Sequence, residues 1–155
     1  MAEFEEAFDE LYRLAYQVAF RLTGSRDESK DAAQEALARA YVRWGRVGPY
    51  AEAWVSKVSA NLVLDGWRRS RRPRGLPEVS PAPTDALAAD RLDLLRALST
   101  LPRRQREVLA LRYLADLPLA NVADALGCTV GTVKQHAARG LEALRHSPDV
   151  TPQEA

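Results

Sequence analysis

The chain has 155 residues, 46% of them hydrophobic, a length and composition that suit one globular domain or two small ones. Such an apolar content excludes a chain that is disordered throughout. The formal net charge is only +1, so any case for a nucleic-acid partner depends on where the charge lies. The single cysteine, Cys128, excludes an internal disulfide and a cysteine-cluster metal site.

The start of the sequence lacks a basic region followed by an apolar run, which is the pattern of a signal peptide. No apolar run approaches the length of about 18 residues that a membrane-spanning helix needs. We therefore expect a cytoplasmic protein without membrane insertion.

Apolar residues at helical spacing predict three helices in the first half of the chain. The first helix carries one apolar stripe and ends near Gly24. Ser25 and Glu28 then fit a capping box for the second helix, which ends near Trp44. Pro49 fits the first turn of the third helix, where its missing N–H costs nothing. The residues of the first two helices expected to face the core are Phe4, Phe8, Leu11, Ala15, Val18, Leu22, Ala33, Ala36, Leu37, Ala40 and Tyr41.

The third predicted helix runs into an arginine cluster, after which the composition changes. The segment RPRGLPEVSPAPTD holds four prolines, which break helices and favour an extended linker. Helical spacing resumes at Leu87, and Pro102 marks the start of a further helix. No segment shows sustained period-two alternation, so we predict an all-α fold with two small helical domains. The predicted divisions are a first domain over 1–72, a linker over 73–86, a second domain over 87–146 and a tail over 147–155.

The segment VADALGCTVGTVKQH has the features of a helix-turn-helix. Ala123 is small where two helices must approach closely, and Gly127 stands at the turn, where only glycine adopts a positive φ at little cost. Thr129 can cap the second helix through its hydroxyl. The N-terminus of that helix is then free to face phosphate, and its first turns can read base edges in the major groove.

The side chains of this last helix suit DNA. Lys134 and Arg139 can reach phosphate or guanine, and Gln135 can pair with adenine. Between Arg91 and Arg145 there are nine basic and five acidic residues, a net charge of +4 in a chain that is nearly neutral as a whole. Phosphate binding requires such a basic surface. A helical hairpin with a glycine turn and no DNA contact remains the alternative.

Two stretches resemble one family. The segment LPRRQREVLALRYLADLPLANVADALGCTVGTVKQHAARGLEALR resembles region 4 of bacterial RNA polymerase sigma factors, while DAAQEALARAYVRW and AWVSKVSANLVLDGWRRSRR resemble region 2. Region 2, a short linker and region 4 are the plan of the extracytoplasmic-function (ECF) sigma factors. The resemblance covers about Phe4 to Arg145. It implies a subunit that binds core RNA polymerase and directs promoter recognition and transcription initiation, and that is not an enzyme.

In region 2, the resemblance implies a docking face for the β′ clamp helices of the polymerase, formed by Asp31, Gln34 and Glu35. Asp31 and Glu35 lie four residues apart and so share one helix face, which suits a basic partner. An ordinary solvated face is the alternative.

Five further residues match the part of region 2 that melts and captures the minus-10 promoter element. Asn61 would lie by a pocket for a flipped base, next to the loop from Gly45 to Ala53, because an amide can pair with a base edge. Trp54 shares a helix face with Asn61, and packing in the core is its alternative role. Basic tracks with stacking surfaces typically hold single-stranded DNA, although an arginine run can also be a solvated tail. The five residues are Trp54, Asn61, Trp67, Arg68 and Arg69.

In region 4, the resemblance places five residues where the family reads the minus-35 element. Ala137 and Ala138 stand where bulkier side chains are common, so the promoter sequence does not follow from the chain. The resemblance also implies contact with the polymerase β flap and, as a further partner, an anti-sigma factor. The five minus-35 residues are Thr132, Lys134, Gln135, Ala138 and Arg139.

Two other function classes remain open at this point. The C-terminal motif is also similar to that of LuxR-type regulators, which would bind DNA without core polymerase. An interaction protein without DNA contact would keep the fold, but its affinity would not fall steeply with salt as DNA binding does. The sequence has no P-loop, GxSxG or HExxH motif, and neither His136 nor His146 has metal-ligating neighbours. We therefore expect no catalytic site, no metal and no cofactor.

Overall fold

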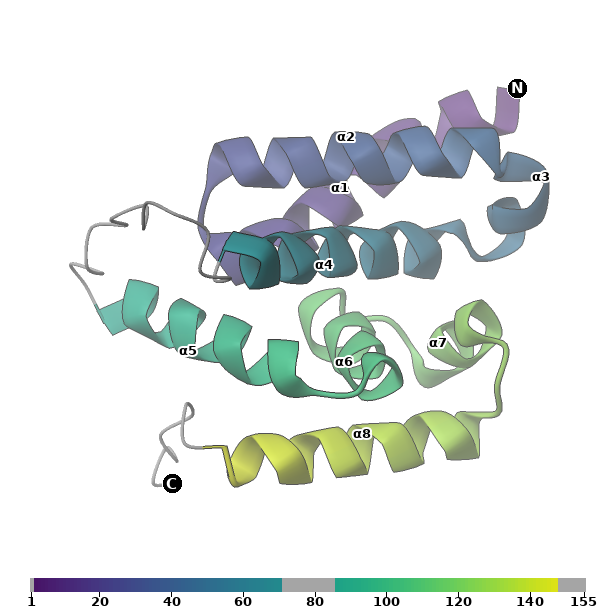
Figure 1. Ribbon diagram of the computed structural model, residues 1–155. Coiled ribbons are helices and arrows are strands. Elements are labelled where there is room, and N and C mark those ends of the chain that lie inside the picture. Colours follow the sequence, from purple (N-terminus) through teal and green to yellow (C-terminus); the bar gives the residue numbers. More distant parts are fainter. Residues whose placement is uncertain (1, 71–85, 148–155) are drawn as a thin grey trace.

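The computed structural model describes residues 2–70 and 86–147, and these form helices without a strand (Figure 1), so the all-α prediction is confirmed. Apart from Ala86 and Ser147, the predicted linker 73–86 and tail 147–155 lie outside the described residues. The N-terminal half contains α1 (Ala2–Thr23), α2 (Arg26–Val42), α3 (Trp44–Val47), the 3-10 turn η1 (Gly48–Tyr50) and α4 (Ala51–Ser70). The C-terminal half contains α5 (Ala86–Thr100), α6 (Arg103–Leu109), the π-helical turn η2 (Ala110–Leu114), α7 (Leu119–Leu126) and α8 (Val130–Arg145). Within the described residues, no helix has both the length and the apolar content to cross a membrane.

Local signals in the sequence fix several helix ends. Gly24 adopts φ 65°, which ends α1. The Ser25 hydroxyl accepts a hydrogen bond from the Glu28 backbone amide at 3.2 Å, so the predicted cap of α2 is confirmed. Pro49 lies in η1, the short 3-10 turn immediately before α4, rather than in the first turn of α4 itself. The helical turn at Pro49 was therefore predicted correctly, but as part of the wrong element.

In the N-terminal half, α1, α2 and α4 pack as a three-helix bundle (Figure 1). Small residues on the inner face of α2 let the helices approach closely. Two side chains predicted to face this core are exposed instead, Phe8 by 40% and Tyr41 by 53%. The buried ring of Phe4 fills that end of the bundle, and both residues pack edge-on against it, at centroid distances of 5.9 and 5.2 Å. Phe8 and Tyr41 therefore lie at the surface, on top of Phe4, and shield that end of the bundle core from water.

The N-terminal bundle has a core of its own, and a second core is shared between the two halves. Val18 and Leu22 of α1 and Leu64 of α4 are fully buried in one apolar cluster with residues of the C-terminal half. Polar contacts join the same surfaces, since the Arg21 guanidinium donates to the Leu114 carbonyl at 2.6 Å and to the Asp116 carboxylate at 3.1 Å. We call this cluster the shared core. Its C-terminal members are Leu95, Leu98, Leu101, Val108, Leu109, Ala110, Leu111, Ala115, Leu117, Val122, Ala123, Leu126 and Val133.

In the C-terminal half, α7 and α8 form the predicted helix-turn-helix. Gly127 adopts φ 67° between them, in the left-handed region that favours glycine. Val122 and Val133 are fully buried at the joint. Gly140 lets α8 approach α6 closely, because a Cβ at this position would lie 2.9 Å from Leu109 Cδ1.

The predicted cap of α8 is also confirmed, because the Thr129 hydroxyl accepts a hydrogen bond from the Thr132 backbone amide at 3.1 Å. Replacing Thr129 with alanine leaves that amide without its partner. We expect the free energy of unfolding to fall by about 1 kcal/mol, measured by urea denaturation. Thr129→Ser, which keeps the hydroxyl, is the matched control and should stay close to wild type. An equal loss in both variants would contradict the capping role.

Candidate nucleic-acid and partner interfaces

α8 presents one face to solvent at the outer edge of the molecule, on the side away from α2 (Figure 1). Lys134, Gln135, Ala138 and Arg139 are exposed and recur at the spacing of a single helix face. The fifth predicted minus-35 residue, Thr132, is half-buried at the start of this face, where its hydroxyl lies 3.0 Å from that of Thr129. The structure thus brings four of the five residues together on one exposed surface, which we call the α8 face.

The opposite side of α8 explains this orientation. Val133 is fully buried in the shared core, and Ala137 and Leu144 pack partly against it. These three residues hold the basic and amide side chains outward. Thr129, Val130 and Gly131 are exposed, so the N-terminus of α8 lies at the surface. The helix dipole favours an anion there.

α2 presents a second exposed face. Four of its five alanines and Leu37 are buried in the bundle with α1 and α4, while Asp31, Gln34 and Glu35 are exposed to solvent. Glu35 accepts a hydrogen bond from Arg39 Nε at 2.9 Å. We call this surface the α2 face.

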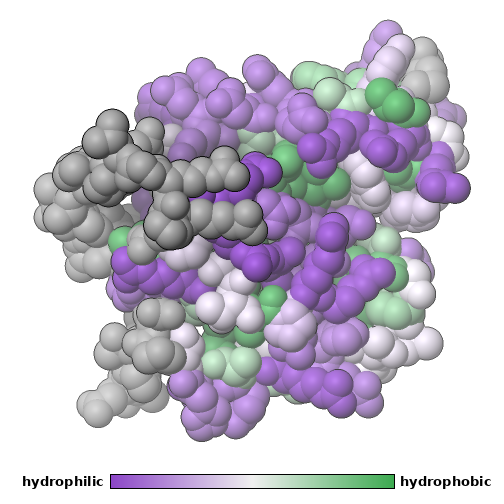
Figure 2. Space-filling view, viewed as in Figure 1, coloured by the Kyte–Doolittle hydropathy of each residue, from purple (hydrophilic) through white to green (hydrophobic). Residues whose placement is uncertain are grey.

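Val42 continues the α2 face and was not among the residues predicted to dock on a partner. It is 78% exposed and lies eleven residues after Asp31, which is close to three full helical turns. Helical spacing alone could have placed it there. Figure 2 shows apolar side chains at the surface near the end of the molecule where α1 begins and α2 ends. The α2 face is therefore acidic at one end and apolar at the other.

The five predicted minus-10 residues of α4 are not brought together on one free surface. Trp54 is half-buried against the core of the N-terminal bundle. Trp67 is half-buried against the shared core, and Arg68 and Arg69 are exposed in the last turn of α4. Asn61 is only 8% exposed, because the C-terminal half covers it.

Asn61 is covered by a carboxylate. Its Nδ2 donates a hydrogen bond to Glu107 Oε2 of α6 at 2.8 Å. Glu107 is 2% exposed, and Arg103 and Arg104 approach its carboxylate oxygens at 3.5 and 3.4 Å. The Oδ1 atom of Asn61 is buried and has no hydrogen-bond partner among the described residues. The side chain thus makes its amide contact with the other half of the same chain.

Further basic groups surround this buried acid. Burial lowers the pKa of the Lys57 ammonium on α4, and the nearby charges of Arg104 and Arg103 lower it further, while Glu107 opposes them. Burial also lowers the pKa of the Arg106 guanidinium, with Arg68 acting in the same direction. The interface between the halves therefore combines buried polar groups with the apolar side chains of the shared core.

The segment predicted as a loop next to the base pocket, Gly45 to Ala53, is helical instead, in α3, η1 and the start of α4, and the surface that it forms is shared between the halves. A cavity of about 370 Å³ is lined by residues 48–53 and Trp44, together with Glu10 of α1 and Asn121 and Asp124 of α7. The Trp44 indole nitrogen is buried and has no hydrogen-bond partner among the described residues.

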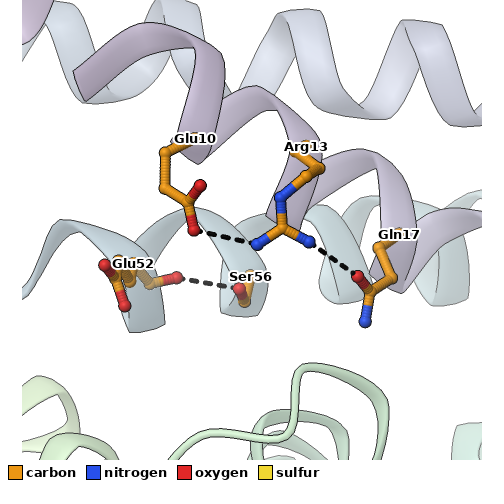
Figure 3. A network of polar contacts seen from close by, with 5 residues as sticks. All are labelled: Glu10, Arg13, Gln17, Glu52 and Ser56. Atoms are coloured by element: carbon orange, nitrogen blue, oxygen red, sulfur yellow. Dashed lines mark hydrogen bonds and ion pairs between the residues drawn. The ribbon is translucent and has the colours of Figure 1, made fainter. Parts of the chain in front are cut away.

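Polar contacts fix one edge of this cavity (Figure 3). Arg13 donates to Glu10 at 2.8 Å and to Gln17 at 3.2 Å, and the Ser56 hydroxyl donates to the Glu52 carbonyl at 2.8 Å. Within the described ranges, no three histidine, cysteine or acidic side chains gather to hold a metal ion.

The sequence matches two protein families in the same order along the chain. Sigma-70 region 2 matches residues 7–73, and Sigma-70, region 4 matches residues 91–144. The first match covers the N-terminal bundle and the second covers α5 to α8. Because the N-terminal half matches sigma region 2, the alternative of a LuxR-type regulator has no support.

Individual relatives agree with these matches. The RNA polymerase sigma-E factor of Streptomyces coelicolor is 34% identical over 117 residues, covering 71% of this chain and 66% of the relative. This chain thus spans slightly less than two thirds of the length of the curated sigma-E relatives that it matches. The ECF RNA polymerase sigma factor SigW of Bacillus subtilis is 31% identical over 130 residues, covering 71% of this chain and 70% of the relative.

A solved structure shares the fold. The sigma factor RpoE of Bartonella quintana, crystallised with the anti-sigma factor NepR, superposes with a TM-score of 0.58 at 21% identity, covering 94% of this chain and 96% of that one. Two sigma regions in order, and a curated ECF relative matched over 70% of its length, assign the family. The chain belongs to the extracytoplasmic-function sigma factors of bacterial RNA polymerase.

Proposed function

We propose that this chain binds core RNA polymerase and directs promoter recognition and transcription initiation in the cytoplasm. The observation that carries the proposal is that regions 2 and 4 each present an exposed helix face, α2 and α8, on opposite sides of the molecule (Figure 1). In this role the chain takes no cofactor and is not an enzyme, because catalysis stays with the polymerase.

The α2 face would dock on the β′ clamp helices. Its carboxylates, Asp31 and Glu35, suit a basic surface and would steer the encounter, while the exposed Val42 adds an apolar contact at the edge. Interfaces of this kind gain most of their affinity from a few central side chains. We place Gln34 at that centre, because it lies between Asp31 and Glu35 along α2.

The α8 face would read the minus-35 element, and region 4 would also contact the β flap. Lys134 and Gln135 lie in the first turns of α8, the part of a recognition helix that reaches base edges. Arg139 lies one turn further on, within reach of a guanine edge or a phosphate. Region 2 would capture the minus-10 element through Asn61 and Trp54, with Trp67, Arg68 and Arg69 along the strand.

An anti-sigma protein is the remaining proposed partner. The solved RpoE of similar fold was crystallised with its anti-sigma factor NepR, and the similarity extends over 94% of this chain. A protein of that kind would hold this chain away from polymerase by covering the α2 face or the α8 face. Pull-down with the tagged chain from its own host would identify it.

The first test is equilibrium binding of the purified chain to core RNA polymerase, in competition with the housekeeping sigma factor. The wild type is expected to compete. The double variant Asp31→Ala with Gln34→Ala should bind roughly tenfold more weakly, a loss of about 1.4 kcal/mol, because it removes a charge and an amide from the centre of the α2 face.

Glu142→Ala is the matched control, since it removes an exposed carboxylate on α8, on the opposite side of the molecule. It should leave polymerase binding unchanged. No competition by the wild type would exclude the sigma role. Equal binding by the wild type and the double variant would place the docking surface elsewhere.

A further inference from the structure

We propose that the chain inhibits itself: region 4 covers the minus-10 surface of region 2, and Glu107 acts as an internal competitor for Asn61. This inference rests on the proposed function, since it assumes that Asn61 reads a base. The chain would then exist in a closed form, as in Figure 1, and an open form in which α4 is free to capture a single strand.

The contact between Asn61 and Glu107 carries the proposal. A base offers hydrogen-bond acceptors at its edge, and the Glu107 carboxylate takes the place of such an acceptor at 2.8 Å from Asn61 Nδ2. The two side chains are 8% and 2% exposed, so no base can reach this amide in the closed form. Arg103 and Arg104 hold the carboxylate in position and balance its charge.

The apolar part of the interface explains why the closed form persists. Ala53, Ala60 and Leu64 of α4 are buried against region 4 in the shared core. Opening would expose this apolar surface to water, which is unfavourable unless a partner covers it. The free chain therefore favours closure, and stable opening needs a bound partner.

The segment of region 2 expected to flank the base pocket is covered by region 4 in the same way. Asn121 and Asp124 of α7 line the cavity that residues 48–53 form with Trp44. Region 4 thus places two carboxylates, Glu107 and Asp124, at the two parts of region 2 expected to meet a negatively charged strand. Because Arg103 and Arg104 balance the charge of Glu107, the cover acts by occupying these two positions and not by repelling phosphate.

Docking on polymerase does not require opening, because Asp31, Gln34, Glu35 and Val42 are already exposed in the closed form. The closed chain can therefore bind core polymerase through the α2 face before region 4 moves away. Capture of the minus-10 strand then follows only after polymerase is bound, which keeps the free chain off DNA.

Energy transfer between two dyes measures closure in the full chain. The dyes are attached at Arg26→Cys on α2 and Ala143→Cys on α8, both exposed positions, in a background with Cys128→Ala. The labelled chain that keeps both Asn61 and Glu107 is expected to give a single short distance between the dyes. Asn61→Asp sets a second carboxylate against Glu107, and we expect it to lengthen the distance.

A swap of the two groups makes the test specific. Asn61→Asp with Glu107→Gln restores one acid facing one amide, and it should return the short distance. Gln17→Glu is the matched control, since it makes the same amide-to-acid change on α1, where the side chain bonds to Arg13 of the same helix, and it should leave the distance unchanged. An Asn61→Asp chain that stays closed, or a swapped chain that stays open, would overturn the proposal.

Glu107→Ala tests the competition itself, because it removes the oxygen to which Asn61 donates and keeps Asn61. The free Glu107→Ala chain should bind a dye-labelled, mixed-sequence single strand of DNA severalfold more tightly than the wild type, because more of it is open. Unchanged affinity would exclude competition.

Polymerase binding, measured on the same samples, separates the two proposals. If the wild type binds core polymerase but Asn61→Asp stays closed, the sigma function stands and self-inhibition fails. If the dyes respond as expected but the wild type does not bind polymerase, the proposed function fails, and the competitor role fails with it.

Discussion

Replacement of Leu64 by alanine is expected to lower the free energy of unfolding by about 2–5 kcal/mol. Leu64 is fully buried in the shared core, where α4 meets the C-terminal half. Truncation removes three carbon atoms from a site enclosed by both halves of the chain. The neighbouring helices are held by their own contacts and can close the resulting cavity only in part, so the loss includes a cavity term as well as a transfer term.

Urea unfolding of three variants measures this loss. Leu64→Met keeps the volume nearly constant and should cost less than about 1.5 kcal/mol. Leu141→Ala makes the same chemical change on α8 at a side chain that is 39% exposed, so its effect should be much smaller. If Leu64→Ala cost no more than Leu141→Ala, the two halves could not be packed through a common core.

Helix positions and caps were predictable because their signals are local. A serine or threonine hydroxyl reaches an amide three residues away, as at Ser25 and Thr129, and a glycine turn needs no distant partner. The same holds for the exposed faces of α2 and α8. Once the apolar residues of a helix are assigned to the core, the polar residues between them must face water.

The shared core was not predictable in this way. Helical spacing shows that a residue such as Ala60 or Leu64 is buried, but it does not show which helix buries it. α4 packs on two sides, with Val55 in the core of the N-terminal bundle and Leu64 in the shared core. The proline-rich segment lies between two helical regions of the sequence, yet their apolar surfaces meet in space.

Asn61 shows the same limit at the candidate site. Its neighbours in the sequence indicate a polar residue on a helix and nothing more. Its hydrogen-bond partner, Glu107, lies 46 residues further along the chain and in the other half. In the sequence, Glu107 follows three arginines within an ordinary amphipathic helix, so only the tertiary structure shows that it is buried. Contacts between domains produce no periodic pattern in the amino-acid sequence.

Replacement of Arg139 by alanine is expected to weaken promoter binding by the polymerase complex by about 1–3 kcal/mol, roughly 5- to 150-fold. Arg139 is exposed and is the last of the four residues of the α8 face. Its loss should also reduce the slope of log affinity against log salt by about 1, because one fewer phosphate or guanine contact releases fewer counterions.

The promoter for this measurement is selected from a randomised pool by the wild-type complex, and binding is then compared across single-base variants. If Arg139 contacts guanine, the alanine variant should lose discrimination at one base pair; if it contacts phosphate, all sequences should weaken equally. Arg145→Ala is the control, since Arg145 lies in the last turn of α8, far from the first turns that reach base edges, and pairs with Glu142 at 3.4 Å. An Arg139→Ala complex with the affinity and salt slope of the Arg145→Ala complex would show that α8 does not enter the groove through this face.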